Sequence, residues 1–289
     1  MMAKDNTYKK ENAFLVLAKR MSRNKNAMFG LTLFVILVLA IIIVPIVSPY
    51  QYDKMDVMAI KQGPSSAHLF GTDDLGRDIF TRVFYGGRYS LSISIAAVLF
   101  STAIGTVVGA IAGYFGGAAD TVIMRLLDVI QAIPSMLLTI IISAALGVGI
   151  DKTIIAIAVG TIPGNVRLLR GTVMQTRENQ YLEAAEAIGC STARRIMKYV
   201  IPNSWSPLIV AATMGVAKAI LELAALSYIG LGVQPPTPEW GLMLNEGRQQ
   251  LQTAPWLMFF PGLAIFLTVV VFNLWGDSLR DVLDPRQED

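Results

Sequence analysis

The chain is poor in the residues that form covalent links or bind metal. Its 289 residues include one cysteine, Cys190, and one histidine, His68. A single cysteine excludes a disulfide within the chain. No second histidine, cysteine or carboxylate stands at metal-ligand spacing from His68. We therefore expect no metal site, and we interpret His68 as an ordinary loop residue.

Charge is also scarce. Charged residues make up 16% of the chain and hydrophobic residues 54%, and the mean hydropathy is +0.54. A soluble domain of this length does not have that balance. The net charge of +3 is compatible with nucleic-acid binding, but the cations lie beside apolar runs, where membrane orientation accounts for them. The composition predicts a membrane protein that binds no nucleic acid.

Motifs for nucleotide binding and hydrolysis are missing as well. The sequence has no G-x-x-x-x-G-K-[ST] phosphate loop, no H-E-x-x-H and no G-x-S-x-G. Without a phosphate loop, the chain lacks the backbone cradle and the lysine that would hold ATP phosphates. We therefore expect a chain that is not an enzyme and binds no cofactor, so any ATP-driven work must come from another subunit.

What the sequence does contain is a series of long apolar runs. A bilayer requires roughly 20 apolar residues per spanning helix, and six runs fit that requirement. The third holds Arg125 and Asp128, which we expect to pair near the interface, and the fourth is interrupted by Pro163 and Gly164. The predicted fold class is an all-α polytopic membrane protein with six transmembrane helices. The predicted spans are Met28 to Val47, Leu91 to Ala112, Val122 to Leu146, Ile154 to about Leu169, Leu208 to about Gly230, and Trp256 to Trp275.

Lysine and arginine beside the spans predict the orientation. The first 27 residues carry seven cations and two acids, so we expect them to stay in the cytoplasm, and six crossings return the C-terminus there. No small-x-small cleavage site follows the first run, so it is interpreted as a retained helix. The expected organisation is a cytoplasmic tail (1–27) and a transmembrane domain (28–289) with its core at 91–276, outside loops at 48–90 and 231–255, and a cytoplasmic loop at 170–204.

The predicted cytoplasmic loop contains a charged, helix-forming segment, Tyr181 to Pro202. Glu183, Ala184 and their neighbours favour helix, and Gly189 is suited to end it. Ser191 is a plausible N-cap for a second, basic helix. The pattern predicts helix, turn, helix on the cytoplasmic side.

Three segments resemble one known family. Glu183-Ala184-Ala185, Gly189 four residues later, and Pro202 resemble the EAA loop of bacterial ABC importer permeases. GTDDLGRD at 71–78 and GLGVQPPTPEWGLML at 230–244 resemble signatures of the dipeptide, oligopeptide and nickel branch of those permeases. Tyr199 and Ile201 depart from the broad EAA consensus, which has Ile and Leu there. The resemblance spans His68 to Leu244.

This resemblance implies a type I ABC importer permease-like bundle in the bacterial inner membrane, in contact with lipid. It implies a transmembrane subunit that forms a translocation path with a second, homologous permease chain. Two ATPase subunits would bind ATP and Mg, and an extracytoplasmic solute-binding protein would deliver cargo. Short peptides are the favoured cargo, and nickel or another metal chelate is the alternative. An ion-coupled secondary transporter is a remote alternative from another class.

The same resemblance implies that the loop docks on an ATPase, with Glu183 to Ile188 in a groove of that subunit. The residues assigned to this coupling loop are Glu183, Ala184, Ala185, Gly189, Arg194 and Arg195. For the two arginines and Lys198, contact with lipid headgroups is an open alternative.

Two features inside the spans have alternative explanations. Gly105, Gly109 and Gly113 recur every four residues and predict close helix packing, either static or sliding. Lys218 and Glu222 lie four apart in the fifth span, where an isolated charge is costly. They either line a translocation path or form a buried ion pair.

Two predictions concern the outside loops. We expect Asp73 and Arg77 to pair on a short, solvated amphipathic helix that begins near Asp73 and ends at Gly86 and Gly87. In the second loop, we expect Trp240 to be an interfacial anchor.

Overall fold

The computed structural model describes residues 22 and 24–283. Most of the basic tail on which the orientation argument rests, and the last six residues, therefore lie outside the described residues. The described part is helical and contains no β-strand. Its α-helices are α2 (Lys25–Val47), α3 (Ile79–Phe115), α4 (Gly117–Gln131), α5 (Ser135–Leu146), α6 (Ile150–Arg177), α7 (Gln180–Ala187), α8 (Thr192–Arg195), α9 (Ile201–Asn203), α10 (Trp205–Tyr228), α11 (Trp240–Gly247) and α12 (Trp256–Leu283).

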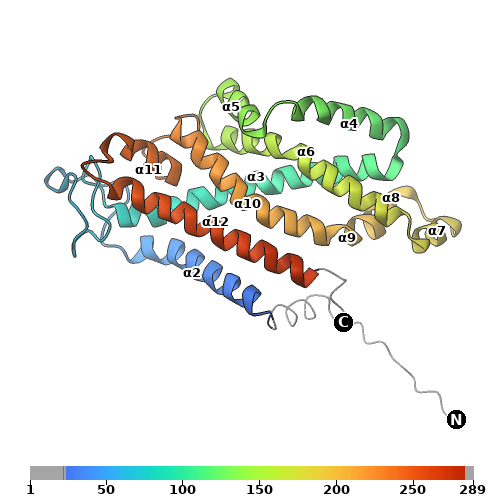
Figure 1. Ribbon diagram of the computed structural model, residues 1–289, viewed down its shortest axis with the longest axis horizontal. Coiled ribbons are helices and arrows are strands. Elements are labelled where there is room, and N and C mark those ends of the chain that lie inside the picture. Colours follow the sequence, from blue (N-terminus) through green and yellow to red (C-terminus); the bar gives the residue numbers. More distant parts are fainter. Residues whose placement is uncertain (1–21, 23, 284–289) are drawn as a thin grey trace, which may run out of the picture.

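The described helices match the predicted polytopic architecture. Five of them, α2, α3, α6, α10 and α12, are long and apolar enough to cross a membrane, and α4 with α5 makes a sixth candidate if that bent pair is one span. The helices form an elongated bundle in which the loop before α3 and α11 lie at one end and α7 lies at the other (Figure 1). The predicted all-α fold class is therefore confirmed.

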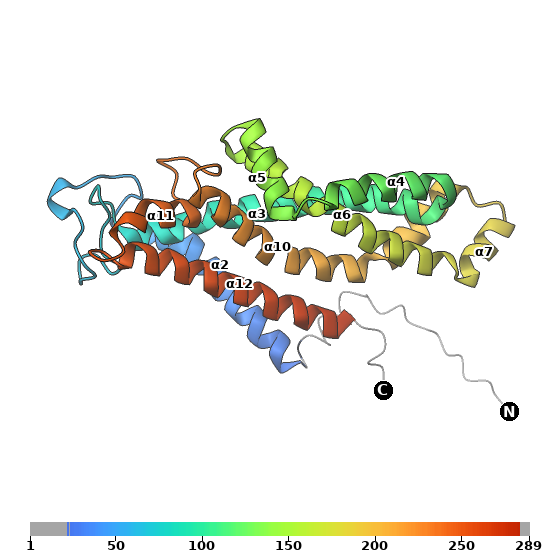
Figure 2. The same ribbon diagram turned by 45° about the horizontal axis from the view of Figure 1, so that its top comes forward.

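The third predicted span is not one helix. The sequence predicted a span from Val122 to Leu146, and the structure divides this stretch: α4 ends at Gln131, α5 begins at Ser135, and their axes differ by 84°. Pro134 lacks an N–H and disfavours helical geometry at Ile133, and its own backbone is extended at ψ 134°. Figure 2 shows α5 turned away from the line of α4. The predicted third span is therefore a bent pair of helices, and its break is a feature that the sequence pattern did not predict.

The fourth span differs in the opposite direction. Pro163 and Gly164 were expected to interrupt it, yet α6 runs unbroken through both. Pro163 is buried within the bundle, whereas Pro134 is exposed. Packing against neighbouring helices holds α6 in line where proline removes a backbone hydrogen bond.

The close partner of α6 is α3. A Cβ added at Gly105 would lie 2.6 Å from the Cβ of Asn165, and one at Gly109 would lie 2.7 Å from the carbonyl oxygen of Val166. At Gly113 the distance to the carbonyl oxygen of Arg170 would be 2.8 Å. The structure thus places all three glycines directly against α6, because only a hydrogen side chain leaves room for its backbone.

The buried apolar residues form two separate clusters. The larger cluster draws residues from α2, α3, α6, α10, α11 and α12. The smaller one, which we call the loop core, lies where the end of α3 and the end of α6 meet the segment from α7 to α10; it consists of Ala110, Leu169, Val173, Leu182, Val200 and Leu208. The predicted cytoplasmic loop therefore has a hydrophobic core that it shares with two long helices.

Candidate functional site

The first half of the predicted coupling loop is α7, and its end is determined locally. Gly189 has a φ of +80°, in the left-handed region that favours glycine. Its N–H donates to the carbonyl of Glu186 at 2.9 Å, and the N–H of Cys190 donates to the carbonyl of Ala185 at 3.0 Å. These two bonds are those of a Schellman cap. The predicted stop at Gly189 is therefore present in the structure.

The second half of the loop is not the regular helix that the sequence suggested. After the short α8, residues Ile196–Val200 form a π-helical turn that leads into α9. The N–H of Ile201 donates to the carbonyl of Ile196, five residues earlier, just before Pro202, which has no N–H to donate. Ser191 has the extended backbone of an N-cap, but its side chain makes no capping hydrogen bond.

The faces of α7 have different environments. Leu182 and Ala185 are buried, and Leu182 belongs to the loop core. Glu183 and Ala184 are exposed, and Ile188 at the tip is 86% exposed. The predicted coupling residues thus divide: Ala185 fixes the helix to the bundle, while Glu183 and Ala184 are available to a partner.

The two arginines of the coupling loop also have different environments. Arg194 is exposed, whereas the side chain of Arg195 is only 11% exposed and turns back into the chain. Arg195 Nη1 lies 2.5 Å from Glu186 Oε2, and its guanidinium lies 5.9 Å from the ring centre of Tyr114 at the end of α3. The hydrogen bond with Glu186 raises the pKa of Arg195 above its ordinary value. Arg195 therefore connects α7 and α8 to α3, a role that sequence reasoning missed.

At the opposite end of the bundle, a buried charge network replaces the predicted solvated helix. Arg77 Nε lies 2.6 Å from Asp73 Oδ2, so the predicted pair forms, but both side chains are buried and neither belongs to a helix. Instead Asp78 caps α3, which continues through Gly86 and Gly87. The expected solvated helix from Asp73 to Gly87 was therefore wrong.

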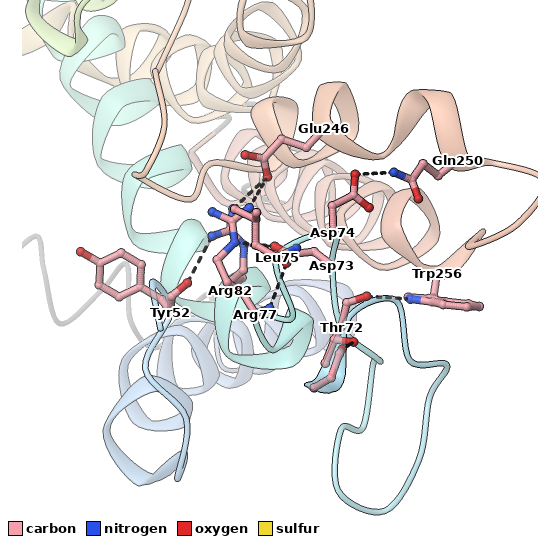
Figure 3. A network of polar contacts seen from close by, with 11 residues as sticks. Tyr52, Thr72, Asp73, Asp74, Leu75, Arg77, Arg82, Glu246, Gln250 and Trp256 are labelled. Atoms are coloured by element: carbon pink, nitrogen blue, oxygen red, sulfur yellow. Dashed lines mark hydrogen bonds and ion pairs between the residues drawn. The ribbon is translucent and has the colours of Figure 1, made fainter. Parts of the chain in front are cut away.

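The network extends to residues distant in sequence (Figure 3). Arg82, 1% exposed, donates from Nη2 to Glu246 Oε2 at 2.9 Å and from Nη1 to the carbonyl of Tyr52 at 3.2 Å. Arg77 Nη2 reaches the same Glu246 oxygen at 3.3 Å. Three segments, namely the loop after α2, the start of α3 and α11, are thereby joined. No local pattern identified Glu246, because it lies 164 residues from Arg82.

Trp240 is part of this joined region and is not an interfacial anchor. It is 1% exposed, and its indole N–H donates to the carbonyl of Val83 at 2.8 Å. The preceding Glu239 caps α11 through Leu242 N–H at 3.0 Å and accepts a hydrogen bond from Ser90. Burial raises the pKa of the Glu239 carboxyl above its ordinary value. The predicted anchor is wrong because the tryptophan, the first residue of α11, is buried against α3 instead of lying at the surface.

Midway along the bundle, the structure places Lys218 beside a cavity of about 460 Å³. Lys218 Nζ lies 3.7 Å from Glu222 Oε1; the lysine side chain is 57% exposed and that of Glu222 only 8%. The cavity lies between α3, the α4–α5 bend, α6 and α10. The two residues thus form an ion pair of which the lysine member also lines a cavity.

Charge pairs also connect α4 to α6. Asp128 lies 3.9 Å from Arg125, as the sequence suggested, but only 2.5 Å from Arg167 on α6. Asp120 and Arg170 make a second link at 2.5 Å.

Within the described residues, no group of three or more His, Cys, Asp or Glu side chains could hold a metal ion.

These features together describe a membrane protein made of a helix bundle. The helix α7 lies at one end of the bundle, the buried network of Arg82 and Glu246 lies at the other, and the cavity beside Lys218 lies between them. Comparison with known families agrees. The family described as binding-protein-dependent transport system inner membrane component matches residues 105–289, and the N-terminal transmembrane domain of oligopeptide transport permease C matches residues 14–64. The chain belongs to this family of ABC importer permeases, whose members are membrane subunits and not enzymes.

Individual relatives are similar along most of their length. The dipeptide transport system permease protein DppC of Alkalihalophilus pseudofirmus is 45% identical over 93% of this chain and 89% of its own. The glutathione transport system permease protein GsiD of Pectobacterium atrosepticum is 44% identical over 88% of this chain and 85% of its own. A solved structure of the MetNI methionine ABC transporter, facing inward, matches in fold with a TM-score of 0.57 at 17% identity, over 70% of this chain and 96% of that one.

Proposed function

We propose that this chain imports short peptides through a path that it forms with a second permease chain in a bacterial inner membrane. The relatives named above carry dipeptide and glutathione in their names, and both cargoes are peptides. The chain contains no phosphate loop, so the ATP and Mg belong to ATPase subunits. The α7 end faces the cytoplasm and the ATPase, and the α11 end faces the solute-binding protein.

The observation that carries the coupling assignment is the combination of an exposed tip with a rigid support. Glu183, Ala184 and Ile188 are exposed, while Leu182 anchors the same helix in the loop core and Ala185 is buried beside it on α7. When the ATPase moves α7, a helix packed in this way passes the movement on to the ends of α3 and α6, because it shares a hydrophobic core with them. The exposed residues therefore contact the ATPase, and Arg195 holds them in position from within the chain.

The network at the other end supports a docking role for the outside loops. Because Arg82 contacts both Glu246 of α11 and the carbonyl of Tyr52 in the loop after α2, the two outside loops are joined into one surface. A solute-binding protein that docks there would contact a preformed platform, which lowers the ordering cost of association.

Co-purification tests this function. The chain, gently solubilised from its native membrane, should bring down ATPase subunits, and dialanine uptake by the reconstituted complex should require ATP. Glu183→Lys should insert normally but weaken ATPase association, because it reverses an exposed charge at the proposed contact. Asp151→Lys is the matched control, since it reverses an exposed acid at the far end of α6. Uptake that persists without ATP or ATPase would show that the proposed function is wrong.

A further inference from the structure

The cavity midway along the bundle has one charged lining residue among those the structure describes, Lys218. We propose that Lys218 binds the carboxylate of a peptide in transit, so that this cavity is a peptide-binding station inside the membrane domain. The proposal rests on the peptide-import function above and adds a site and a ligand group to it.

The position of Lys218 suits a halfway station. It lies thirteen residues after Trp205 and ten before Tyr228, the two ends of α10. At 1.5 Å per residue it is about 20 Å from one end and about 15 Å from the other. A charge at this depth is costly unless it has a partner or faces water. The cavity lets Lys218 face water, and it leaves room for an anionic ligand.

The ammonium group of Lys218 has hydrogen-bond donors that the described residues do not use. Its distance of 3.7 Å to Glu222 is too long for a hydrogen bond, and no other ion pair or hydrogen bond of Lys218 occurs among the described residues. An ammonium has three N–H donors. Glu222 is buried on the next turn of α10, so its charge balances the lysine from the protein side, while the largely exposed lysine side chain lines the cavity. A ligand carboxylate can therefore approach without displacing Glu222.

The rest of the lining suits a peptide. Ser101, Gln131, Thr161 and Asn165 bring hydroxyl and amide groups to the cavity, and Asn165 Nδ2 donates to Ser101 Oγ at 3.0 Å. Such neutral groups pair with peptide N–H and C=O groups without selecting side chains. The volume of about 460 Å³ lies within the usual range of small-molecule pockets. The cavity thus combines one cation for a terminus with neutral donors and acceptors for a backbone.

Competition binding tests the carboxylate assignment. The complete permease–ATPase complex in lipid nanodiscs, without solute-binding protein, is incubated with radiolabelled dialanine and increasing dialanine or dialaninamide. The amide lacks the carboxylate and is otherwise nearly the same size. We expect wild type to prefer dialanine by about tenfold or more, the usual effect of a charge-assisted hydrogen bond. Lys218→Gln should remove the preference, and Lys218→Arg should retain most of it.

A double variant distinguishes this proposal from a purely structural ion pair. If Lys218 serves only to neutralise Glu222, then Lys218→Gln with Glu222→Gln should restore the behaviour of wild type. If Lys218 binds the peptide, the double variant should remain unselective, while Glu222→Gln alone should keep the preference for dialanine.

The possible outcomes separate this inference from the proposed function. A wild-type complex that takes up dialanine with ATP and its binding protein, but binds both probes equally or neither, overturns the station and leaves the importer intact. A complex that takes up no dialanine contradicts the peptide-import function itself. Restored selectivity in the double variant would also overturn the role of Lys218.

Discussion

Substituting Gly189 offers the sharpest test of how the loop is built. Its φ of +80° costs an L-residue about 1–2 kcal/mol, and an added Cβ would meet nothing within 4 Å. Gly189→Ala therefore introduces backbone strain without a steric clash. That cost reduces the capped form of α7 relative to uncapped forms by about 5- to 30-fold.

The substitutions should follow a graded order. Asparagine tolerates left-handed geometry, so Gly189→Asn should cost less than alanine. Gly189→Pro should cost most, because proline fixes φ near −65° and removes the N–H that donates to Glu186. We expect membrane insertion to be unchanged in every variant, since the site lies outside the spans.

The assay is ATP hydrolysed per dialanine imported by reconstituted transporter, together with the affinity of the complex for its ATPase subunits. The expected order of coupling is glycine, asparagine, alanine, proline. Gly171→Ala is the matched control, because Gly171 also has open space around its Cβ but lies within α6 without a positive φ. If Gly189→Ala couples as well as wild type while Gly171→Ala is also silent, the Schellman cap is not needed for coupling.

Three further predictions concern stability, each measured by unfolding in detergent. Arg82→Met should destabilise the fold by about 3 kcal/mol, because it leaves Glu246 without its closest partner; the milder Glu246→Gln should cost less, and equal costs would contradict the network. Gly109→Ala should destabilise by about 1–3 kcal/mol, because its Cβ would lie 2.7 Å from a backbone oxygen of α6, unlike Gly171→Ala, which should be neutral or stabilising. Burial raises the pKa of Glu239, so the folded state holds its proton more tightly than the unfolded state, and the stability from this group should fall as pH rises through the folded pKa. Glu239→Gln should flatten that pH dependence, and an unchanged slope would assign it to another group.

The sequence by itself determined the helical membrane architecture, because bilayer thickness and backbone hydrogen bonding leave few alternatives for long apolar runs. It also determined the end of α7 at Gly189, since a left-handed cap depends on the local preference of glycine. The glycines of α3 were identified as packing residues from their spacing alone, and they lie against α6. These features depend on residues within a few turns of one another.

Tertiary structure decided whether a helix breaks at Pro134 or Pro163 and which partners the buried charges have. Pro134 is exposed and breaks a helix, whereas Pro163 is buried and does not, so the same residue type has two outcomes set by its neighbours. The pairing of Arg82 with Glu246 brings together residues 164 positions apart, which no local pattern encodes. Whether Lys218 faces a cavity or only Glu222 depends likewise on how four separate segments pack around it. Local preference fixes the conformation of a short segment, but burial and ion pairing depend on which segments the fold brings into contact.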